Sequence, residues 1–155
     1  MQKKTILFVC LGNICRSPTA EGIFKKIILE NSLENFFEVD SAGLISVHQG
    51  ELSDRRMSYH AAKRGYDLQH RSRPVSTDDF ERFDLIIAMD DNNISGLEEI
   101  ANSPEDKAKI HRMTDYLQKL EADHVPDPYY GGDQGFENVI DLLEDACEGL
   151  YKSLK

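Results

Sequence analysis

An eight-residue stretch near the start of the chain places a cysteine and an arginine around a loop of the size that holds an anion. The stretch, Cys10-Leu11-Gly12-Asn13-Ile14-Cys15-Arg16-Ser17, follows an apolar run and precedes Pro18, which favours the first turn of a helix. Backbone N–H groups of such a curled loop converge at the positive end of the following helix dipole, where anions bind. The same dipole and a nearby cation stabilise a thiolate. The pattern therefore predicts a site in which a thiolate faces a phosphate ester.

Three residues of this loop have types that suit a phosphoryl group. A guanidinium such as that of Arg16 holds two phosphate oxygens with parallel hydrogen bonds, which a lysine cannot do. Gly12 allows close approach of the backbone to the anion. Asn13 tolerates a left-handed backbone conformation that most residues resist. The loop is thus predicted to bind the anion with its backbone and with Arg16.

The strands that must position this loop are short and apolar. Thr5 to Val9 is a continuous apolar run with β-branched and aromatic residues, which is typical of a strand covered on both faces in a parallel sheet. Residues 85–89 have the same character, residues 36–41 are a third candidate, and residues 109–116 are a weaker fourth. Strands that alternate with helices predict right-handed βαβ units and a doubly wound α/β fold with a four-stranded parallel sheet and helices on both faces. Ligands bind such folds beyond the carboxyl ends of the strands, where Cys10 would lie.

Helices are predicted between and after these strands, within one domain spanning residues 1–155. Ser17 is expected to cap a helix whose apolar face begins at Ile23 and Phe24. Residues 53–63 and 92–100 are further helices, and Pro104 marks a break or a new start. The last helix has the clearest periodicity, with one apolar stripe on which Cys147 is a small core residue; the stripe comprises Phe136, Val139, Ile140, Leu143, Cys147 and Leu150.

Composition limits the classes of partner. The net charge is −10, and residues 77–155 hold 20 acidic against 7 basic residues, whereas residues 1–76 are mildly basic. This balance argues against nucleic acid and fits an anionic substrate drawn to one positive mouth. The chain has neither a twenty-residue apolar span nor a signal-peptide pattern, and its three cysteines suit thiols in a reducing compartment. We therefore expect a cytoplasmic protein without a membrane span, monomeric or weakly self-associating.

Three motifs of the chain resemble the low-molecular-weight protein tyrosine phosphatases over essentially the whole sequence. They are the strings Val9–Pro18, Asp40–Gly43 and Asp127–Gly131. The resemblance implies a phosphotyrosine phosphatase in which Cys10 forms a phosphocysteine intermediate and Ser17 steadies its thiolate. It also implies that Asp127 protonates the departing phenolic oxygen and then activates water.

The resemblance also implies further binding and supporting residues. Ser41 and His70 would brace the loop, although a serine in a turn and a solvent-facing histidine are ordinary alternatives. Tyr129 would form one wall of a cleft for a phenyl ring. The family commonly has tryptophan where this chain has Val47, which would make the opposite wall smaller. The expected substrate-binding set is Leu11, Gly12, Asn13, Ile14, Cys15, Ser17, Val47, Tyr129 and Tyr130.

No cofactor is expected, because the five histidines have no metal-ligand spacing with acidic residues or cysteines. Cys15 lies in the same loop as Cys10 and is a candidate resolving cysteine that would trap an oxidised nucleophile as a disulfide. A small packing residue is the alternative.

Three other functions remain open at this point. An arsenate reductase of similar architecture would need two further downstream cysteines, and the chain has one, Cys147. A protein arginine phosphatase typically has threonine where this loop has Ile14, and lacks the paired tyrosines. A module that captures phosphotyrosine without turnover would have no need of Cys10, Arg16 and Asp127 together.

Overall fold

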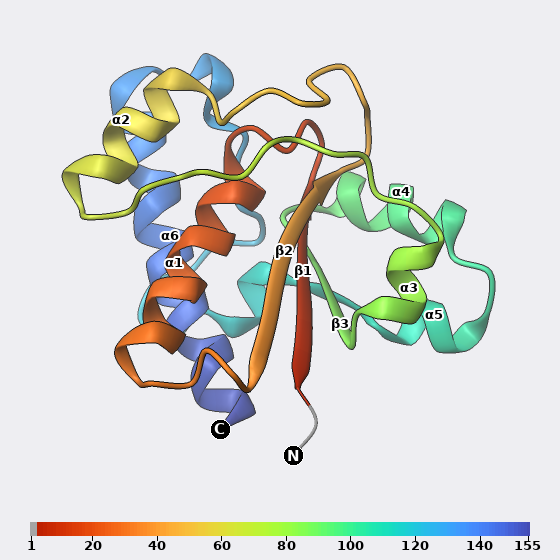
Figure 1. The fold of residues 1–155 in the computed structure, drawn as a ribbon. Helices are drawn as coiled ribbons and strands as arrows, with labels where there is room; N and C mark the ends of the chain where they lie inside the picture. Colours follow the sequence, from red (N-terminus) through yellow and green to blue (C-terminus); the bar gives the residue numbers. More distant parts are fainter. Residues whose placement is uncertain (1–2) are drawn as a thin grey trace.

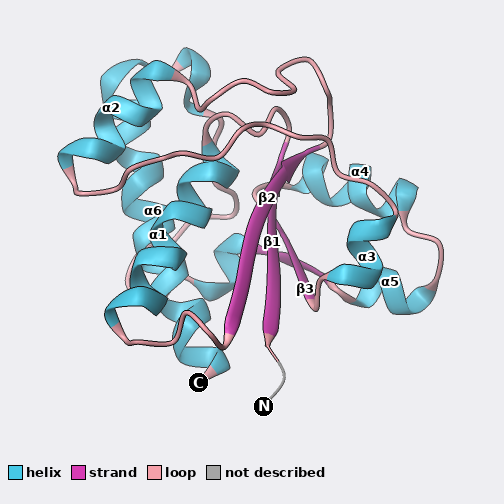
Figure 2. Ribbon diagram, in the orientation of Figure 1, coloured by secondary structure: helices cyan, strands magenta, loops and turns pink. Residues whose placement is uncertain are grey.

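The protein is built on a parallel sheet of four strands in the order β2-β1-β3-β4 (Figures 1 and 2). The computed structural model describes residues 3–155, with the side chain of Tyr130 excepted. The strands are β1 (Lys4–Cys10), β2 (Phe37–Gly43), β3 (Leu85–Ala88) and β4 (Ile110–Arg112). The predicted four-stranded parallel α/β fold is confirmed.

Helices cover both faces of the sheet (Figure 1). On one side lie α1 (Arg16–Glu30), α2 (Arg55–Lys63) and the long α6 (Gly132–Leu154). On the other lie α3 (Asp78–Arg82), α4 (Asp91–Ile100) and α5 (Pro104–Ala108). Two short 3-10 helices, Met113–Tyr116 and Pro128–Tyr130, complete the described elements.

Strand β1 is the centre of the fold because its side chains alternate between two apolar cores. Ile6 and Phe8 pack in the core that contains residues of α1 and α6, whereas Leu7 and Val9 pack in the core that contains residues of α3 and α4. All four are fully buried, as the continuous apolar run predicts. The chain leaves β1 at Cys10, between the carboxyl ends of β2 and β3. This is the topological switch point at which doubly wound sheets bind ligands.

Several element boundaries differ from the prediction. The predicted strand over 109–116 ends at Arg112, where a 3-10 helix begins. Helix α1 begins at Arg16, one residue before the predicted cap Ser17, whose hydroxyl contacts the Cys10 thiol instead. Pro104 starts a helix, with Ser103 as its N-cap. The short helix α3 was not predicted, since its five residues are too few for apolar periodicity.

No helix within residues 3–155 is both long enough and apolar enough to cross a membrane.

Candidate active site

A cavity of about 270 Å³ lies beyond the carboxyl end of β1. Its floor is the loop of residues 10–17 that the sequence singled out, and its walls come from two distant loops. The lining residues are Cys10, Leu11, Gly12, Ile14, Cys15, Arg16, Ile45, His48, Asp127 and Tyr129. We refer to residues 10–17 as the cavity floor, and to Ile45, His48, Asp127 and Tyr129 as the cavity walls.

The Cys10 thiol lies at the bottom of the cavity, where it is only 2% exposed. Its Sγ is 2.9 Å from the Ser17 hydroxyl and accepts a longer contact of 3.4 Å from the Ser17 backbone N–H. Ser17 belongs to the first turn of α1, so the sulfur faces the positive end of that helix dipole. The sulfur thus lies at the anion-binding end of α1, in contact with the hydroxyl and the backbone N–H of Ser17.

Asn13 fixes the shape of the cavity floor from behind. Its backbone φ is 58°, the left-handed conformation that its residue type was predicted to tolerate. Its buried amide nitrogen donates to the hydroxyls of Ser17 (2.7 Å) and Ser41 (3.0 Å). Its amide oxygen accepts from the Arg73 backbone N–H (3.1 Å) and from His70 Nε2 (2.9 Å). Ser41 and His70 therefore contact the loop through Asn13.

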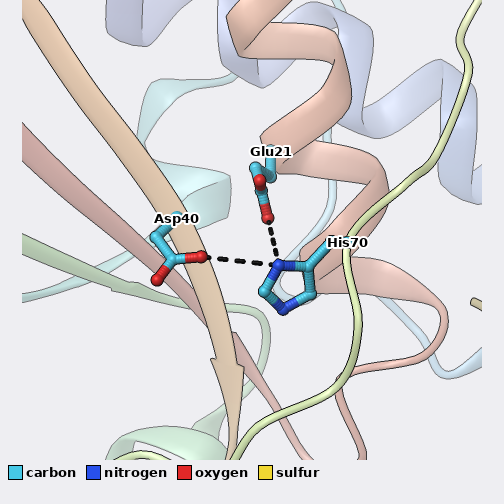
Figure 3. A group of neighbouring side chains, drawn as sticks. All are labelled: Glu21, Asp40 and His70. Carbon is cyan, nitrogen blue, oxygen red and sulfur yellow. Dashed lines mark ion pairs between the residues drawn. The ribbon is translucent and has the colours of Figure 1, made fainter. Parts of the chain in front are cut away.

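Behind Asn13, His70 joins two carboxylates (Figure 3). Its Nδ1 is 3.3 Å from Glu21 Oε1 and 3.4 Å from Asp40 Oδ1. Ser41 donates to the same Glu21 oxygen at 2.6 Å. The other ring nitrogen faces the amide oxygen of Asn13, so both nitrogens of His70 have acceptors to which they can donate.

Glu21, Asp40 and His70 are also the one group of three or more metal-ligating residues whose ligand atoms lie within 4.8 Å in the described part of the chain. The second oxygen of each carboxylate is already paired, Glu21 with Lys25 (2.5 Å) and Asp40 with Arg73 (3.1 Å). The carboxylate charge is thus balanced by cationic side chains, which fits a network that supports the loop better than a metal centre.

Arg16 is buried beside the thiol and oriented by groups that the sequence analysis did not identify. It is 3% exposed, and its Nη1 donates to Asp90 Oδ2 (2.7 Å) and to the Val125 carbonyl (3.0 Å). Asp90 is itself held as the N-cap of α4, where it accepts from the Asn93 backbone N–H at 2.8 Å. Asp90 lies two residues after the end of β3, at the carboxyl edge of the sheet, which is the signal that could have identified it.

Asp127 lies at the mouth of the cavity and is 45% exposed. Its Oδ1 accepts from the Tyr129 backbone N–H at 3.1 Å and so caps the 3-10 turn that follows. Its Oδ2 is 3.8 Å from Arg16 Nη2. The carboxylate and the Cys10 thiol therefore line one cavity from opposite ends of the sequence.

The cavity walls differ from the expectation at Val47. Tyr129 is 39% exposed and lines the cavity, with the Arg56 guanidinium 5.0 Å from its ring centroid. Val47 is 74% exposed and is not a lining residue; Ile45 and His48, which were not predicted, line the cavity instead. The backbone of residues 46–51 makes a tight turn, in which the Gln49 N–H donates to the Ser46 carbonyl and the Glu51 N–H donates to the His48 carbonyl. The pattern of residue types in the sequence does not predict this turn. The side chain of Tyr130 lies outside the described residues.

The other two cysteines are buried and unpaired. Burial raises the pKa of the Cys15 thiol, and the nearby Asp54 carboxylate raises it further, so that Cys15 is held as a neutral thiol. Cys147 is fully buried, its pKa is raised by burial, and its Sγ lies 3.6 Å from the Ala20 carbonyl. The prediction of Cys147 as a core residue is confirmed, whereas a redox role for Cys15 stays a prediction.

Fold and site together define an α/β protein in which a thiol at a helix N-terminus, a buried guanidinium and a carboxylate share one anion-sized cavity. The family model for low molecular weight phosphotyrosine protein phosphatase matches residues 5–155. A Synechocystis protein that bears the family's name is 49% identical over 151 residues, which cover 96% of this chain and 95% of the relative.

Solved structures of related phosphatases have the same fold. A protein tyrosine phosphatase from Entamoeba histolytica with Hepes in its active site has a TM-score of 0.95 at 47% identity, covering 98% of this chain and 97% of that one. A Drosophila arginine phosphatase has a TM-score of 0.89 at 35% identity, covering 97% of both chains. The chain belongs to the low molecular weight phosphotyrosine protein phosphatase family, and it is accordingly a hydrolase.

Proposed function

We propose that the protein hydrolyses phosphotyrosine and small aryl phosphates through a covalent phosphocysteine on Cys10. The observation that carries the proposal is the shared cavity, in which Cys10, Arg16 and Asp127 meet although Asp127 lies more than a hundred residues away in sequence. Hepes, a sulfonate, occupies the active site of the Entamoeba histolytica relative, which supports a site that binds tetrahedral anions.

Arg16 and the loop backbone bind the phosphate. Nη1 of Arg16 is occupied by Asp90 and Val125, which leaves Nε and Nη2 to donate to two phosphate oxygens. The α1 dipole adds positive potential at the same place. These groups balance the charge that the transferring phosphoryl group carries on its three equatorial oxygens.

In the first step the Cys10 thiolate attacks phosphorus, so that an S–P bond forms as the P–O bond to the phenol breaks. The departing phenolic oxygen takes a proton from Asp127, whose position at the cavity mouth is where a leaving group would lie. The Ser17 hydroxyl, 2.9 Å from the sulfur, stabilises the thiolate before attack.

In the second step Asp127, now ionised, accepts a proton from water as the water oxygen attacks phosphorus. The S–P bond breaks, inorganic phosphate leaves and Cys10 returns as a thiolate. One carboxylate thus acts as acid and then as base, and the protein's own residues supply the charges that the reaction needs. We expect no metal requirement and no effect of a chelator on activity.

The cavity walls favour an aryl ester. Tyr129 offers an aromatic face and Ile45 an apolar one, which together suit a phenyl ring. The Drosophila relative named as an arginine phosphatase makes phosphoarginine the second candidate substrate. Ile14 lines the cavity in this protein, and the bulk of its branched side chain disfavours phosphoarginine as the substrate. Phosphotyrosine proteins are therefore the proposed partners, in the cytoplasm, where the three unpaired thiols would stay reduced.

Parallel assays test the proposal. Wild type and Cys10→Ser are compared on phosphotyrosine, an aryl phosphate and phosphoarginine, with and without chelator. We expect turnover of the two phenolic esters by wild type alone, unaffected by chelator. Preference for phosphoarginine, or a sizeable residual rate in Cys10→Ser, would overturn the assignment. Arsenate reduction is disfavoured because Cys147 is buried beneath α1.

A further inference from the structure

Helix α2 and the first turns of α6 are joined by His60, a residue outside the cavity. Its side chain is 4% exposed and lies between two carboxylates of α6. Nδ1 makes a close contact with Glu137 Oε2, and Nε2 is 3.3 Å from Asp133 Oδ1. The imidazole stacks on the Phe136 ring with an interplanar angle of 4° and a centroid separation of 5.5 Å. The two carboxylates and the ring of Phe136 thus hold the imidazole in one orientation.

Both ring nitrogens of His60 face hydrogen-bond acceptors. Carboxylate oxygens accept hydrogen bonds, and only the imidazolium form can donate to both of them at once. Glu137 has further cationic partners on α2, Arg64 at 2.7 Å and Lys63 at 3.4 Å. Hydrogen bonds from Arg64 and then His60 lower the pKa of Glu137 to about 2. Asp133 pairs with no other cation among the described residues.

The part of α6 that His60 holds is continuous with the loop that carries Asp127. The Asp127 cap and the Gly131 N–H to Pro128 carbonyl bond (2.9 Å) close one turn, and α6 begins at the next residue, Gly132. A Cβ on Gly135 would lie 3.9 Å from the Pro128 carbonyl oxygen, so this turn packs against the start of α6. Asp133 therefore lies on the segment that directly continues the turn of Asp127.

A second residue of α2 contacts both segments. The Arg56 guanidinium lies 5.0 Å from the ring centroids of Tyr129 and Phe136, within the range of a cation–π contact. Phe136 in turn stacks on His60, and the Tyr59 ring meets His60 edge-on at 5.3 Å. Helix α2 thus supports Tyr129 of the cavity wall through Arg56, and the helix behind it through His60.

The geometry points to His60 as a positioning residue whose imidazolium bridges Asp133 and Glu137 and so holds the loop of Asp127 and Tyr129 over the cavity. The inference rests on the proposed role of Asp127. On deprotonation the ring keeps one N–H, which stays on Nδ1 because the Glu137 contact is the closer one. Nε2 then presents a lone pair to the Asp133 carboxylate, and the contact turns repulsive. The neutral ring therefore holds the start of α6 less firmly than the imidazolium does.

Asp133→Asn tests the bridge without disturbing the core, because Asp133 is 92% exposed. Glu148→Gln is the matched control: it also removes one charge from an exposed acid of α6, but Glu148 pairs with Lys152. In wild type and the control, the backbone amide resonances of residues 129–132 should shift with the same midpoint as the His60 ring. In Asp133→Asn they should not. The proposal is overturned if these amide resonances do not shift with the His60 ring in wild type, or if they shift with it in Asp133→Asn as well.

Kinetics separate positioning from a merely structural role. For a poor leaving group, which needs the acid, kcat of Asp133→Asn should be up to about fivefold below wild type at acidic pH, the size of an ordinary exposed ion pair. This ratio should approach unity once His60 is neutral, while a good leaving group shows little difference at any pH. Equal ratios for both leaving groups would count against positioning. If wild type hydrolyses no aryl phosphate, the proposed function fails, whereas the resonance shifts still decide the role of His60.

Discussion

The cavity floor and the cavity walls differ in how firmly their side chains are held. On the floor, Asn13 and Arg16 are 1% and 3% exposed, and each donates two hydrogen bonds to buried or half-buried groups. On the walls, Asp127 and Tyr129 are 45% and 39% exposed and sit on a short turn. A rigid floor fixes the attacking sulfur and the phosphate, whereas the walls act on the leaving group. Substitutions in the two regions should therefore have different kinetic signatures.

The largest effect outside the nucleophile is expected at Asp127. Asp127→Asn keeps an oxygen that caps the Tyr129 N–H, but its amide cannot act as a general acid. The kcat for a poor leaving group should therefore fall by ~10²–10⁴. A good leaving group should lose much less. Asp123→Asn, at an exposed residue that pairs with His124 and does not line the cavity, is the control and should behave as wild type. Equal losses for the two leaving groups would contradict an acid on the wall.

Asp90 tests whether the floor depends on the orientation of Arg16. Asp90→Asn weakens the 2.7 Å charged contact to Nη1, and the resulting misplacement of the guanidinium should lower kcat/KM by roughly 10- to 100-fold. Good and poor leaving groups should lose equally, unlike the pattern for Asp127. Asp91→Asn, at the exposed neighbour that pairs with Arg112, serves as control. A loss confined to poor leaving groups would mean that Asp90 acts on the leaving group, as the cavity walls do.

The support of the wall by α2 and α6 should be sensitive to acid. The pKa of Glu137 is lowered from 4.5 to about 2, first by its hydrogen bond to Arg64. Its contribution to stability is therefore present above pH 4.5 and is lost as pH falls towards 2. Glu137→Gln should lower the unfolding free energy at neutral pH by on the order of 1 kcal/mol. Its stability should also decline less between these pH values than that of Glu148→Gln, as measured by urea unfolding.

The smallest effect is expected at Val47, which is exposed and outside the lining. Val47→Trp adds an aromatic ring beside His48, and stacking on an aryl phosphate would be worth about 0.5–1.5 kcal/mol if the ring reaches the cavity. Because Val47 is 74% exposed, we expect a gain at the lower end, seen in KM with kcat unchanged. A large change in kcat would mean that this loop also acts on the floor.

The local structure of the cavity floor could be predicted from the sequence alone, whereas contacts between distant segments could not. The order β1, loop, α1 was predictable because the apolar run, the loop residues and Pro18 are contiguous and act locally. Asn13 was predictable because its left-handed backbone depends on its own side chain. Asp90 and Val125 hold Arg16 only after three distant segments meet, and no periodicity records that contact. Ile45, and not Val47, lines the cavity, and the backbone turns tightly over residues 46–51; residue types alone do not predict that turn.

The covalent step is the central claim, and one measurement addresses it directly. Wild type is mixed with excess aryl phosphate, quenched with denaturant at alkaline pH within the first turnover, digested at that pH because the S–P bond is labile in acid, and analysed by mass spectrometry. The account predicts one added phosphoryl group on the peptide that contains Cys10, and its accumulation in Asp127→Ala with a good leaving group, because the second step there lacks its base. Turnover without any phosphorylated Cys10 peptide, or with the phosphoryl group on another residue, would contradict it.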